Sequence, residues 1–295
     1  MRRVRDFDAA AYFPGRYLIK DQAKYFALRS FFVETGLRPK DASITAEEHL
    51  EWWRTGIHGV VYDDSTRASA VDEQHTNEPT LRLLAILAAE HHWDPQLFDN
   101  VIDARLRDLS VAQYETIGEL QQQAELSCGS LLRLMLSTGS TAPQQSPSNE
   151  DVIRHVGIGH GLAQQLRYSI PLLSTARRLV IPAELTTRYN VRSPRFLLSA
   201  LAQGGDAQCQ QAMQNAVRDI SNLALEAFDQ ARSSPAASSV PVAEVAALTV
   251  PSEVWLERLA DHEYQLTHPD LRTVGLLERG KCAARSVAAY VKKEF

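Results

Sequence analysis

The chain has 295 residues, of which 44% are hydrophobic and 23% charged, so it can bury a sizeable core and is not a wholly disordered chain. Its formal net charge of −5 at pH 7 excludes a protein whose overall field draws it to DNA or to an anionic membrane surface. No apolar run approaches the roughly 18–20 residues that a membrane-spanning helix needs. Because the linker-like segments are short, we expect a single domain over residues 1–295.

The three cysteines, Cys128, Cys209 and Cys282, are odd in number and lie far apart in segments of helical character. This pattern fits buried, reduced thiols better than disulfides or a zinc site, and it indicates a reducing compartment. Residues 2–5 carry three arginines, but no apolar signal core follows them. We therefore expect any transit peptide to be absent or already removed, so targeting is not read directly from the sequence.

Signals for the first turn of an α-helix recur along the chain and precede apolar residues spaced three and four apart. Thr45 with Glu48 matches a capping box. Asp94 with Pro95 matches an N-cap followed by a first-turn proline. Further helix starts are predicted at Thr116, Ser148, Ser193 and Ser252. Since no alternating strand pattern appears, we predict an all-α bundle of about ten helices.

Two polar segments interrupt the helical pattern. Residues 138–149 are rich in proline and serine, and residues 232–241 form a second such stretch. We predict a surface loop at each.

His91 and His92 are expected to end a helix, where an imidazole complements the helix dipole.

Three segments, in the same order along the chain, resemble the squalene/phytoene synthase family. They are residues 25–34, which are similar to the helix before the first aspartate-rich motif, residues 103–109, which resemble the central helix, and residues 161–182, which resemble the region of the second aspartate-rich motif. The resemblance implies an isoprenoid-synthase-like, all-α fold. In that family, two acidic clusters hold Mg²⁺ ions that grip a diphosphate leaving group.

Neither acidic cluster is found at the corresponding positions of this chain. Residues 36–40 contain no Asp or Glu, and Pro171 occupies the place where the second set of acids should begin. Arg177 and Arg178 add positive charge there instead. Without carboxylates to hold Mg²⁺, the departing diphosphate would lose most of its charge stabilisation. We therefore predict a pseudoenzyme with no catalytic residue, no metal site and no cofactor.

A narrower, non-catalytic branch of the family, the mitochondrial complex I assembly factor 6 proteins, matches better. The similar segments are residues 27–34, 52–63, 166–171 and 266–271, and the likeness extends over roughly residues 5–292. The resemblance implies an assembly factor that binds protein partners in a complex I intermediate. It also implies a mitochondrial location on the matrix side of the inner membrane, with peripheral membrane contact.

Three patterns resemble metal or nucleotide sites, and each has a simpler structural interpretation. Asp99 and Asp103 have D-x-x-x-D spacing, but Asp103 and Arg107 form an i,i+4 pair, so a solvated helix face is favoured. The glycines of residues 157–161 follow no strand and are expected to permit close helix contact. His155 and the histidine five residues later do not share a helix face and lack the partners of a zinc set.

Two groups of side chains are candidates for contact with a partner. Trp52 and Trp53 are adjacent and cannot both face one core, so one of them is either an exposed anchor or packed under a neighbouring element; we single out Trp52. Arg167, Arg177 and Arg178 are candidates for contact with an acidic or phosphate-bearing partner, although a plain surface charge is the simpler interpretation.

Two other functions stay open at this point. One is a structural or maturation role in another mitochondrial assembly, such as the mitoribosome, because an inactive fold can be recruited wherever a rigid helical surface helps. The other is an active or lipid-binding prenyl-diphosphate protein. Its unconventional metal ligands would be Asp63, Asp64, Asp99 and Asp103.

Overall fold

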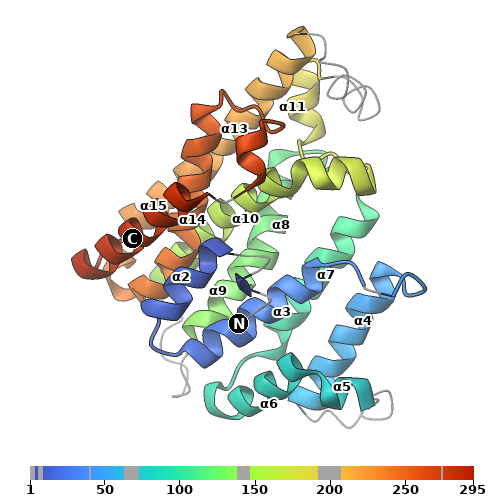
Figure 1. Cartoon of the computed structure of the whole chain (residues 1–295), viewed down its shortest axis with the longest axis vertical. Helices are drawn as coiled ribbons and strands as arrows, with labels where there is room; N and C mark the ends of the chain where they lie inside the picture. Colours follow the sequence, from blue (N-terminus) through green and yellow to red (C-terminus); the bar gives the residue numbers. More distant parts are fainter. Residues whose placement is uncertain are drawn as a thin grey trace.

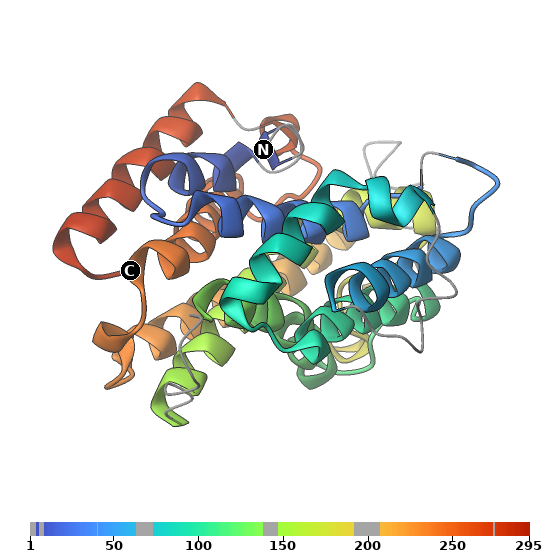
Figure 2. The ribbon, with the colours of Figure 1, turned by 90° about the horizontal axis from the view of Figure 1, so that it is seen from below.

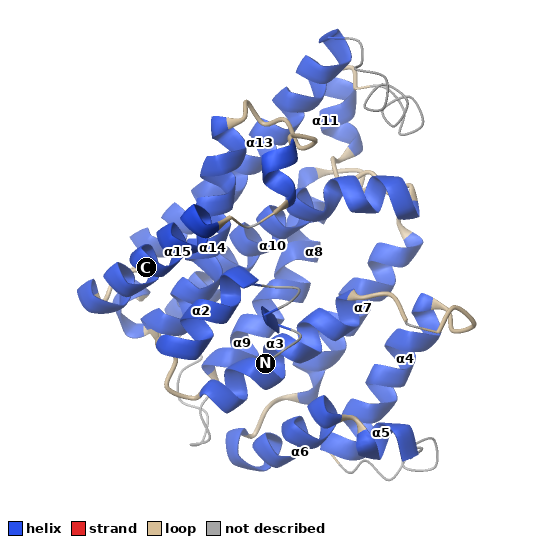
Figure 3. Ribbon diagram, viewed as in Figure 1, coloured by secondary structure: helices blue, strands red, loops and turns tan. Residues whose placement is uncertain are grey.

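A computed structural model of the chain describes most of its residues. The described ranges are 4–5, 9–39, 41–62, 73–137, 147–191, 207–273 and 275–295. These residues form helices and connecting turns and contain no β-strand (Figure 3). The prediction of an all-α fold is therefore confirmed.

The helices follow one another with short connections (Figure 1). In chain order they are α2 (Ala9–Tyr17), α3 (Gln22–Gly36), α4 (Ala46–Gly56), η1 (Ile57–Val61), α5 (Glu73–Asn77), α6 (Pro79–His91), α7 (Pro95–Ser110), α8 (Ile117–Ala124), η3 (Glu125–Gly129), α9 (Ser130–Leu136), α10 (Pro147–Ala176), α11 (Ala183–Arg188), α13 (Ala207–Ser233), η4 (Ala237–Ser239), α14 (Val242–Asp261), η5 (Pro269–Arg272) and α15 (Leu276–Lys292). The segments η1 and η3 are π-helical turns that continue α4 and α8.

Local side-chain chemistry fixes the helix starts that the sequence predicted best. Thr45 accepts a hydrogen bond from the backbone N–H of Glu48, whose carboxylate accepts from the N–H of Thr45, so the capping box is complete. Asp94 accepts from the N–H of Gln96 at the start of α7, and Thr116 accepts from the N–H of Glu119 at the start of α8. His91 is the last residue of α6, and the following residue adopts the left-handed conformation that ends the helix, as predicted.

The predicted helix start at Ser252 is wrong, because Ser252 lies in the middle of α14. Its hydroxyl donates to the carbonyl oxygen of Leu248, one turn earlier, instead of capping a helix end. The helix start predicted at Ser148 agrees with the structure to within one residue, because α10 begins at Pro147. The predicted start at Ser193 lies outside the described residues.

The two predicted loops are both shorter than expected where they can be seen. Helix α10 already covers residues 147–149, and residues 138–146 lie outside the described part. Helix α13 extends to Ser233, so Arg232 is helical and the second loop begins two residues later than predicted. This connection then reaches Pro241, which precedes α14.

Helix α10 packs against α8, η3, α13 and α14 and forms the middle of the bundle (Figure 1). Its glycines explain the close packing: a Cβ atom on Gly157 would lie 2.6 Å from Gly129 Cα, and one on Gly161 would lie 2.5 Å from Ala124 Cβ. These small residues let the helix backbones approach closely, as predicted. At one end of the bundle, α15 lies beside α2 and α14 (Figure 2).

The buried apolar residues gather on both sides of this central helix. One cluster, with Phe31, Trp53 and Phe98 in edge-to-face contact, joins α3, α4 and α7. A second cluster surrounds Phe228 and joins α10 to α13 and α14. All three cysteines are buried and free, as predicted. None of the described helices is both long and apolar enough to cross a membrane.

Candidate functional site: an arginine-lined interior

The position that the family resemblance assigns to the first acidic motif adjoins arginines. Gly36 ends α3, and a Cβ atom built on it would lie 3.5 Å from a terminal nitrogen of Arg105 on α7. The guanidinium of Arg105 lies 4.6 Å from the ring centroid of Phe32, and that of Arg29 lies 5.5 Å from the same centroid. Two cations therefore flank one aromatic ring in this part of the interior.

Arg29 is the most deeply buried of these cations, with 1% of its surface exposed. Burial lowers the pKa of its guanidinium to about 10, and the charge of Arg105 contributes in the same direction. At neutral pH the side chain stays protonated. A protonated guanidinium offers no lone pair to Mg²⁺, which binds oxygen ligands such as carboxylates.

His160, on α10, is held in one tautomer beside Arg29. Because the hydroxyl of Ser252 donates to a backbone carbonyl, its oxygen accepts from Nδ1–H of His160 at 2.8 Å. The amide of Gln164 lies 3.5 Å from the other ring nitrogen. Burial first, and then the charges of Arg29 and Arg167, lower the pKa of His160 to about 3. The imidazole is therefore neutral at physiological pH.

A cavity of about 10 Å³ lies between Arg29, His160, Arg167 and Trp255. This volume suits about one water molecule, because a cavity needs roughly 10–15 Å³ to hold one. Small-molecule sites typically occupy about 300–1,000 Å³. A prenyl chain would enter this cavity only if the surrounding helices separated.

The structure places the three arginines singled out in the sequence in three different settings. Arg167 is half-buried and lines the cavity. Arg178 is 3% exposed, and its guanidinium lies 2.6 Å from the carboxylate of Asp108, so it offers almost no surface to a partner. Arg177 is exposed and adopts a left-handed backbone conformation with φ 53°. Of the three, only Arg177 is exposed to solvent.

One oxygen of the Asp108 carboxylate has three partners in this region. Besides Arg178, it accepts from the hydroxyl of Tyr114 at 2.7 Å and from the amide of Gln123 at 3.0 Å. Burial, followed by the negative charge of Asp108, raises the pKa of Tyr114. Among the described residues, no three His, Cys, Asp or Glu side chains gather here within ligand distance of one another. This region therefore lacks a described set of metal ligands.

Two aspartates of the alternative metal set, Asp99 and Asp103, contact side chains of α4 and η1 instead. Asp99 lies 2.9 Å from a ring nitrogen of His58 and 3.6 Å from Arg54, and Asp103 lies 2.5 Å from Arg54. The expected pairing of Asp103 within its own helix is thus replaced by a contact with α4. The other two aspartates of this set, at positions 63 and 64, lie outside the described residues.

Trp52 is packed under a neighbouring element and is not an exposed anchor. Its ring stacks on His75 with centroids 4.4 Å apart and planes 16° apart, and it meets Trp53 edge to face. Trp53 faces the core and is 2% exposed. The adjacent tryptophans therefore differ as predicted, and α5 covers the outer one.

Sequence reasoning missed Arg29, Arg105 and Asp108 as parts of this site. Arg29 had a visible signal, because it is the one charged residue between Tyr25 and Phe32 in an otherwise largely apolar stretch. A charged side chain in such a stretch is expected to have a specific buried setting. Arg105 and Asp108 carried no such signal, since their helix also bears exposed charges.

The model of the squalene/phytoene synthase family matches residues 20–278. The chain belongs to this family. Two solved structures have the same fold. The squalene synthase HpnC from Alicyclobacillus acidocaldarius has a TM-score of 0.68 and 14% identity, with 90% of this chain and 92% of that chain covered. A ligand-bound dehydrosqualene synthase has a TM-score of 0.65 and 15% identity, with 98% and 94% covered. At this identity the likeness shows the fold alone.

The curated proteins that resemble this chain in sequence are named as complex I assembly factor 6 or its homologs. This chain is 27% identical over 248 residues to the complex I assembly factor 6 homolog of Drosophila melanogaster, with 82% of this chain and 69% of that protein covered. The homolog from Dictyostelium discoideum is 25% identical, with 82% and 63% covered. The assembly factor 6 of Mus musculus is 25% identical, with 70% and 60% covered. The chain therefore spans about two thirds of the length of these relatives.

Proposed function

We propose that this chain is a non-catalytic member of the squalene/phytoene synthase family that binds protein partners during the assembly of respiratory complex I. The observation that carries this proposal is the placement of two arginine side chains. Arg29 and Arg105 lie beside the end of α3, where a synthase would need Mg²⁺-binding carboxylates. The assembly-factor names of the relatives support the choice of complex I.

Arginines can bind phosphate groups, so cationic character alone does not argue against a prenyl diphosphate. Two further features argue against the binding of a prenyl diphosphate. Arg178 is committed to Asp108, and the cavity beside Arg29 has room for about one water molecule instead of a prenyl chain. Both features support a fold that works by binding rather than by turnover. An assay with Mg²⁺ and a prenyl diphosphate should therefore release no diphosphate above the background of the protein-free mixture.

The proposed location is the matrix side of the mitochondrial inner membrane, where the assembly of complex I would require it. The proposed partner contact includes the exposed Arg177 at the end of α10. An acidic surface on the partner would complement it. Trp52 contributes only its partly exposed edge, because its ring is stacked on His75.

Affinity purification of the tagged full chain from mitochondria, followed by proteomics and RNA analysis, tests the proposed role. Enrichment of complex I subunits and of other assembly factors is the expected result. Enrichment of ribosomal proteins and ribosomal RNA would move the chain to mitoribosome assembly. A co-purified prenyl diphosphate, together with diphosphate release in the assay, would overturn the non-catalytic assignment.

A further inference from the structure

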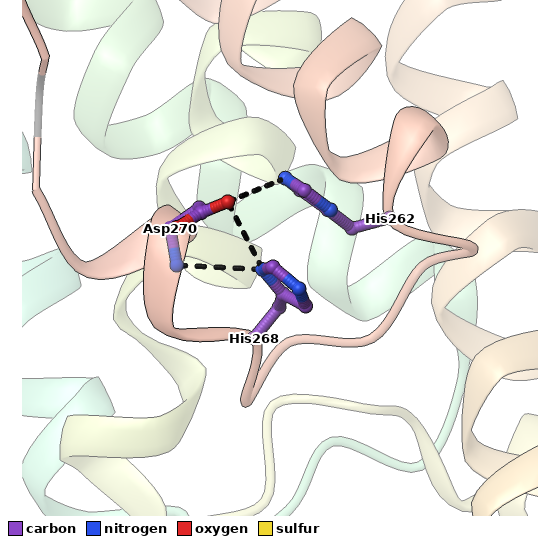
Figure 4. Close-up of side chains that lie close together, drawn as sticks. All are labelled: His262, His268 and Asp270. Atoms are coloured by element: carbon purple, nitrogen blue, oxygen red, sulfur yellow. Dashed lines mark hydrogen bonds and ion pairs between the residues drawn. The ribbon is translucent and has the colours of Figure 1, made fainter.

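Two histidines and an aspartate meet in the connection between α14 and η5, far from the arginine-lined interior in sequence. The three side chains, His262, His268 and Asp270, each offer a ligand atom, and these atoms lie within 4.8 Å of one another (Figure 4). The two imidazole rings stack with centroids 3.8 Å apart and planes 15° apart. The described residues contain no other such group of three.

The backbone of this connection holds the two rings together. His262 ends α14, and the two residues that follow, Glu263 and Tyr264, both adopt left-handed conformations with φ 54° and 60°. Such conformations are unfavourable for residues other than glycine, so the surrounding structure must enforce them. The N–H of Tyr264 donates to the carbonyl of Leu259, and the N–H of His268 donates to that of Gln265. These bonds turn the chain back so that His268 reaches the end of α14.

Pro269 and Arg258 fix the third ligand. Proline after His268 favours the extended backbone seen there, with ψ 130°, and starts the short helix η5 that carries Asp270. The guanidinium of Arg258 donates to the backbone carbonyls of Asp270 and Thr273 and pairs with Glu278. The backbone of Asp270 is therefore anchored while its carboxylate stays directed at the two rings.

The two separations between Asp270 and the histidines are close to those of a tetrahedral metal site, and the two ring nitrogens lie within 4.8 Å of each other. The carboxylate of Asp270 lies 3.7 Å from Nε2 of His262 and 3.8 Å from Nδ1 of His268. Both distances exceed those of good hydrogen bonds. Around Zn²⁺, with ligands at about 2.0–2.1 Å, tetrahedral geometry separates the ligand atoms by about 3.3 Å. A contraction of about half an ångström would bring the carboxylate to that spacing from each ring nitrogen. One of the stacked imidazoles would also have to rotate so that both ring nitrogens point at the ion.

We propose that His262, His268 and Asp270 bind one Zn²⁺ ion, with the fourth position left to water or to a side chain of a partner. Two imidazoles and a carboxylate form a common Zn²⁺ donor set. The cation would take up the negative charge of Asp270, while the charge of Arg258 is already balanced by Glu278. His268 would give up one weak contact, the 3.3 Å hydrogen bond that its Nδ1 accepts from the N–H of Asp270.

The fourth coordination position of the proposed site is open because the ligand side chains are partly exposed to solvent. The side chain of Asp270 is 63% exposed, whereas those of His262 and His268 are 24% and 31% exposed. Solvent therefore reaches the site from the aspartate side. A bound ion would join the end of α14 to the segment that leads into α15 and would stabilise this connection against opening.

Calorimetric titration of the tag-free full chain with Zn²⁺, after removal of metals with a chelator, tests the proposal. One ion per chain is the expected stoichiometry. In addition, Co²⁺ should give the intense visible absorption of a tetrahedral complex. His268→Ala and Asp270→Asn should each weaken Zn²⁺ binding by about tenfold or more, since even the loss of a partner that supports a ligand costs 10–100-fold.

The matched control is His92→Asn, which removes an exposed histidine at the end of α6 and leaves a residue that tolerates its left-handed backbone. This variant should bind Zn²⁺ as the wild type does. Circular dichroism of each metal-free variant establishes that the chain is folded. Binding that is absent in the wild type, or that persists unchanged in both His268→Ala and Asp270→Asn, would overturn the proposal.

Discussion

The guanidinium of Arg178 lies 2.6 Å from the carboxylate of Asp108 and ties the segment after α10 to the last turns of α7. Both side chains are largely buried, with 4% and 13% exposure. A backbone hydrogen bond from Leu179 to Ala112 runs beside this pair. The segment after α10 therefore holds two parts of the fold together.

Replacing one partner of this pair should destabilise the fold strongly. Arg178→Met leaves Asp108 buried without its cation and is expected to lower the free energy of unfolding by about 3–5 kcal/mol. Urea denaturation followed by circular dichroism measures the change. The double variant Arg178→Met, Asp108→Leu should lose less than the sum of the two single variants, because no uncompensated charge remains.

The exposed pair of Arg188 and Asp219 serves as the control for this prediction. Its atoms lie 3.5 Å apart, and the Arg188 side chain is 56% exposed. Arg188→Met should cost no more than about 1 kcal/mol, the usual worth of a surface ion pair. Equal losses in the buried and the exposed pair would show that Arg178 is not the anchor described above.

The stability of the fold should decrease on acidification because of His160. Its pKa is about 3 in the folded chain and about 6.5 when exposed, so the unfolded chain binds more protons between these values. The contribution of His160 is fully present above about pH 6.5 and is lost as the pH falls toward 3. The free energy of unfolding, measured in urea at several pH values, should fall more steeply for the wild type than for His160→Asn. Parallel pH profiles for the two proteins would contradict the buried, neutral imidazole.

Close packing of α10 against η3 predicts a large effect of a single methyl group. Gly157→Ala places a Cβ atom 2.6 Å from Gly129 Cα, and a backbone atom cannot rotate away. We expect a loss of about 1–3 kcal/mol or more in the free energy of unfolding. Gly280→Ala is the matched control, because no atom lies within 4 Å of its Cβ position on α15. It should stabilise the chain by about 0.5–1 kcal/mol through improved helix propensity.

The proposed partner contact predicts a selective effect at Arg177. Arg177→Glu should reduce the recovery of complex I subunits in affinity purification several-fold, since it reverses the charge offered to an acidic partner. The free energy of unfolding of the Arg177→Glu variant should change little, because the side chain of Arg177 is exposed. The control is Arg82→Glu, which reverses an exposed charge on α6. Equal recovery with both variants would place the contact elsewhere on the surface.

Interactions within one helical turn were predictable from the sequence. The caps at Thr45, Asp94 and Thr116 depend on residues two or three positions away, so spacing alone revealed them. Ser252 shows the limit of such reasoning. Its hydroxyl satisfies a carbonyl of its own helix and accepts from His160 on α10, and the sequence does not show that these two helices meet.

The sequence by itself determined the all-α class, the best-capped helix starts, the family resemblance and the lack of acids at residues 36–40, because each depends on residue type and short spacing. Only the tertiary structure decided which charged side chains form ion pairs and which stay exposed. Arg54 pairs with Asp103 from another helix, Arg178 is buried against Asp108, and Arg177 beside it stays exposed. The physical reason is that ion pairing and burial depend on how distant helices pack, and adjacent residues of the same type can lie on opposite sides of that packing.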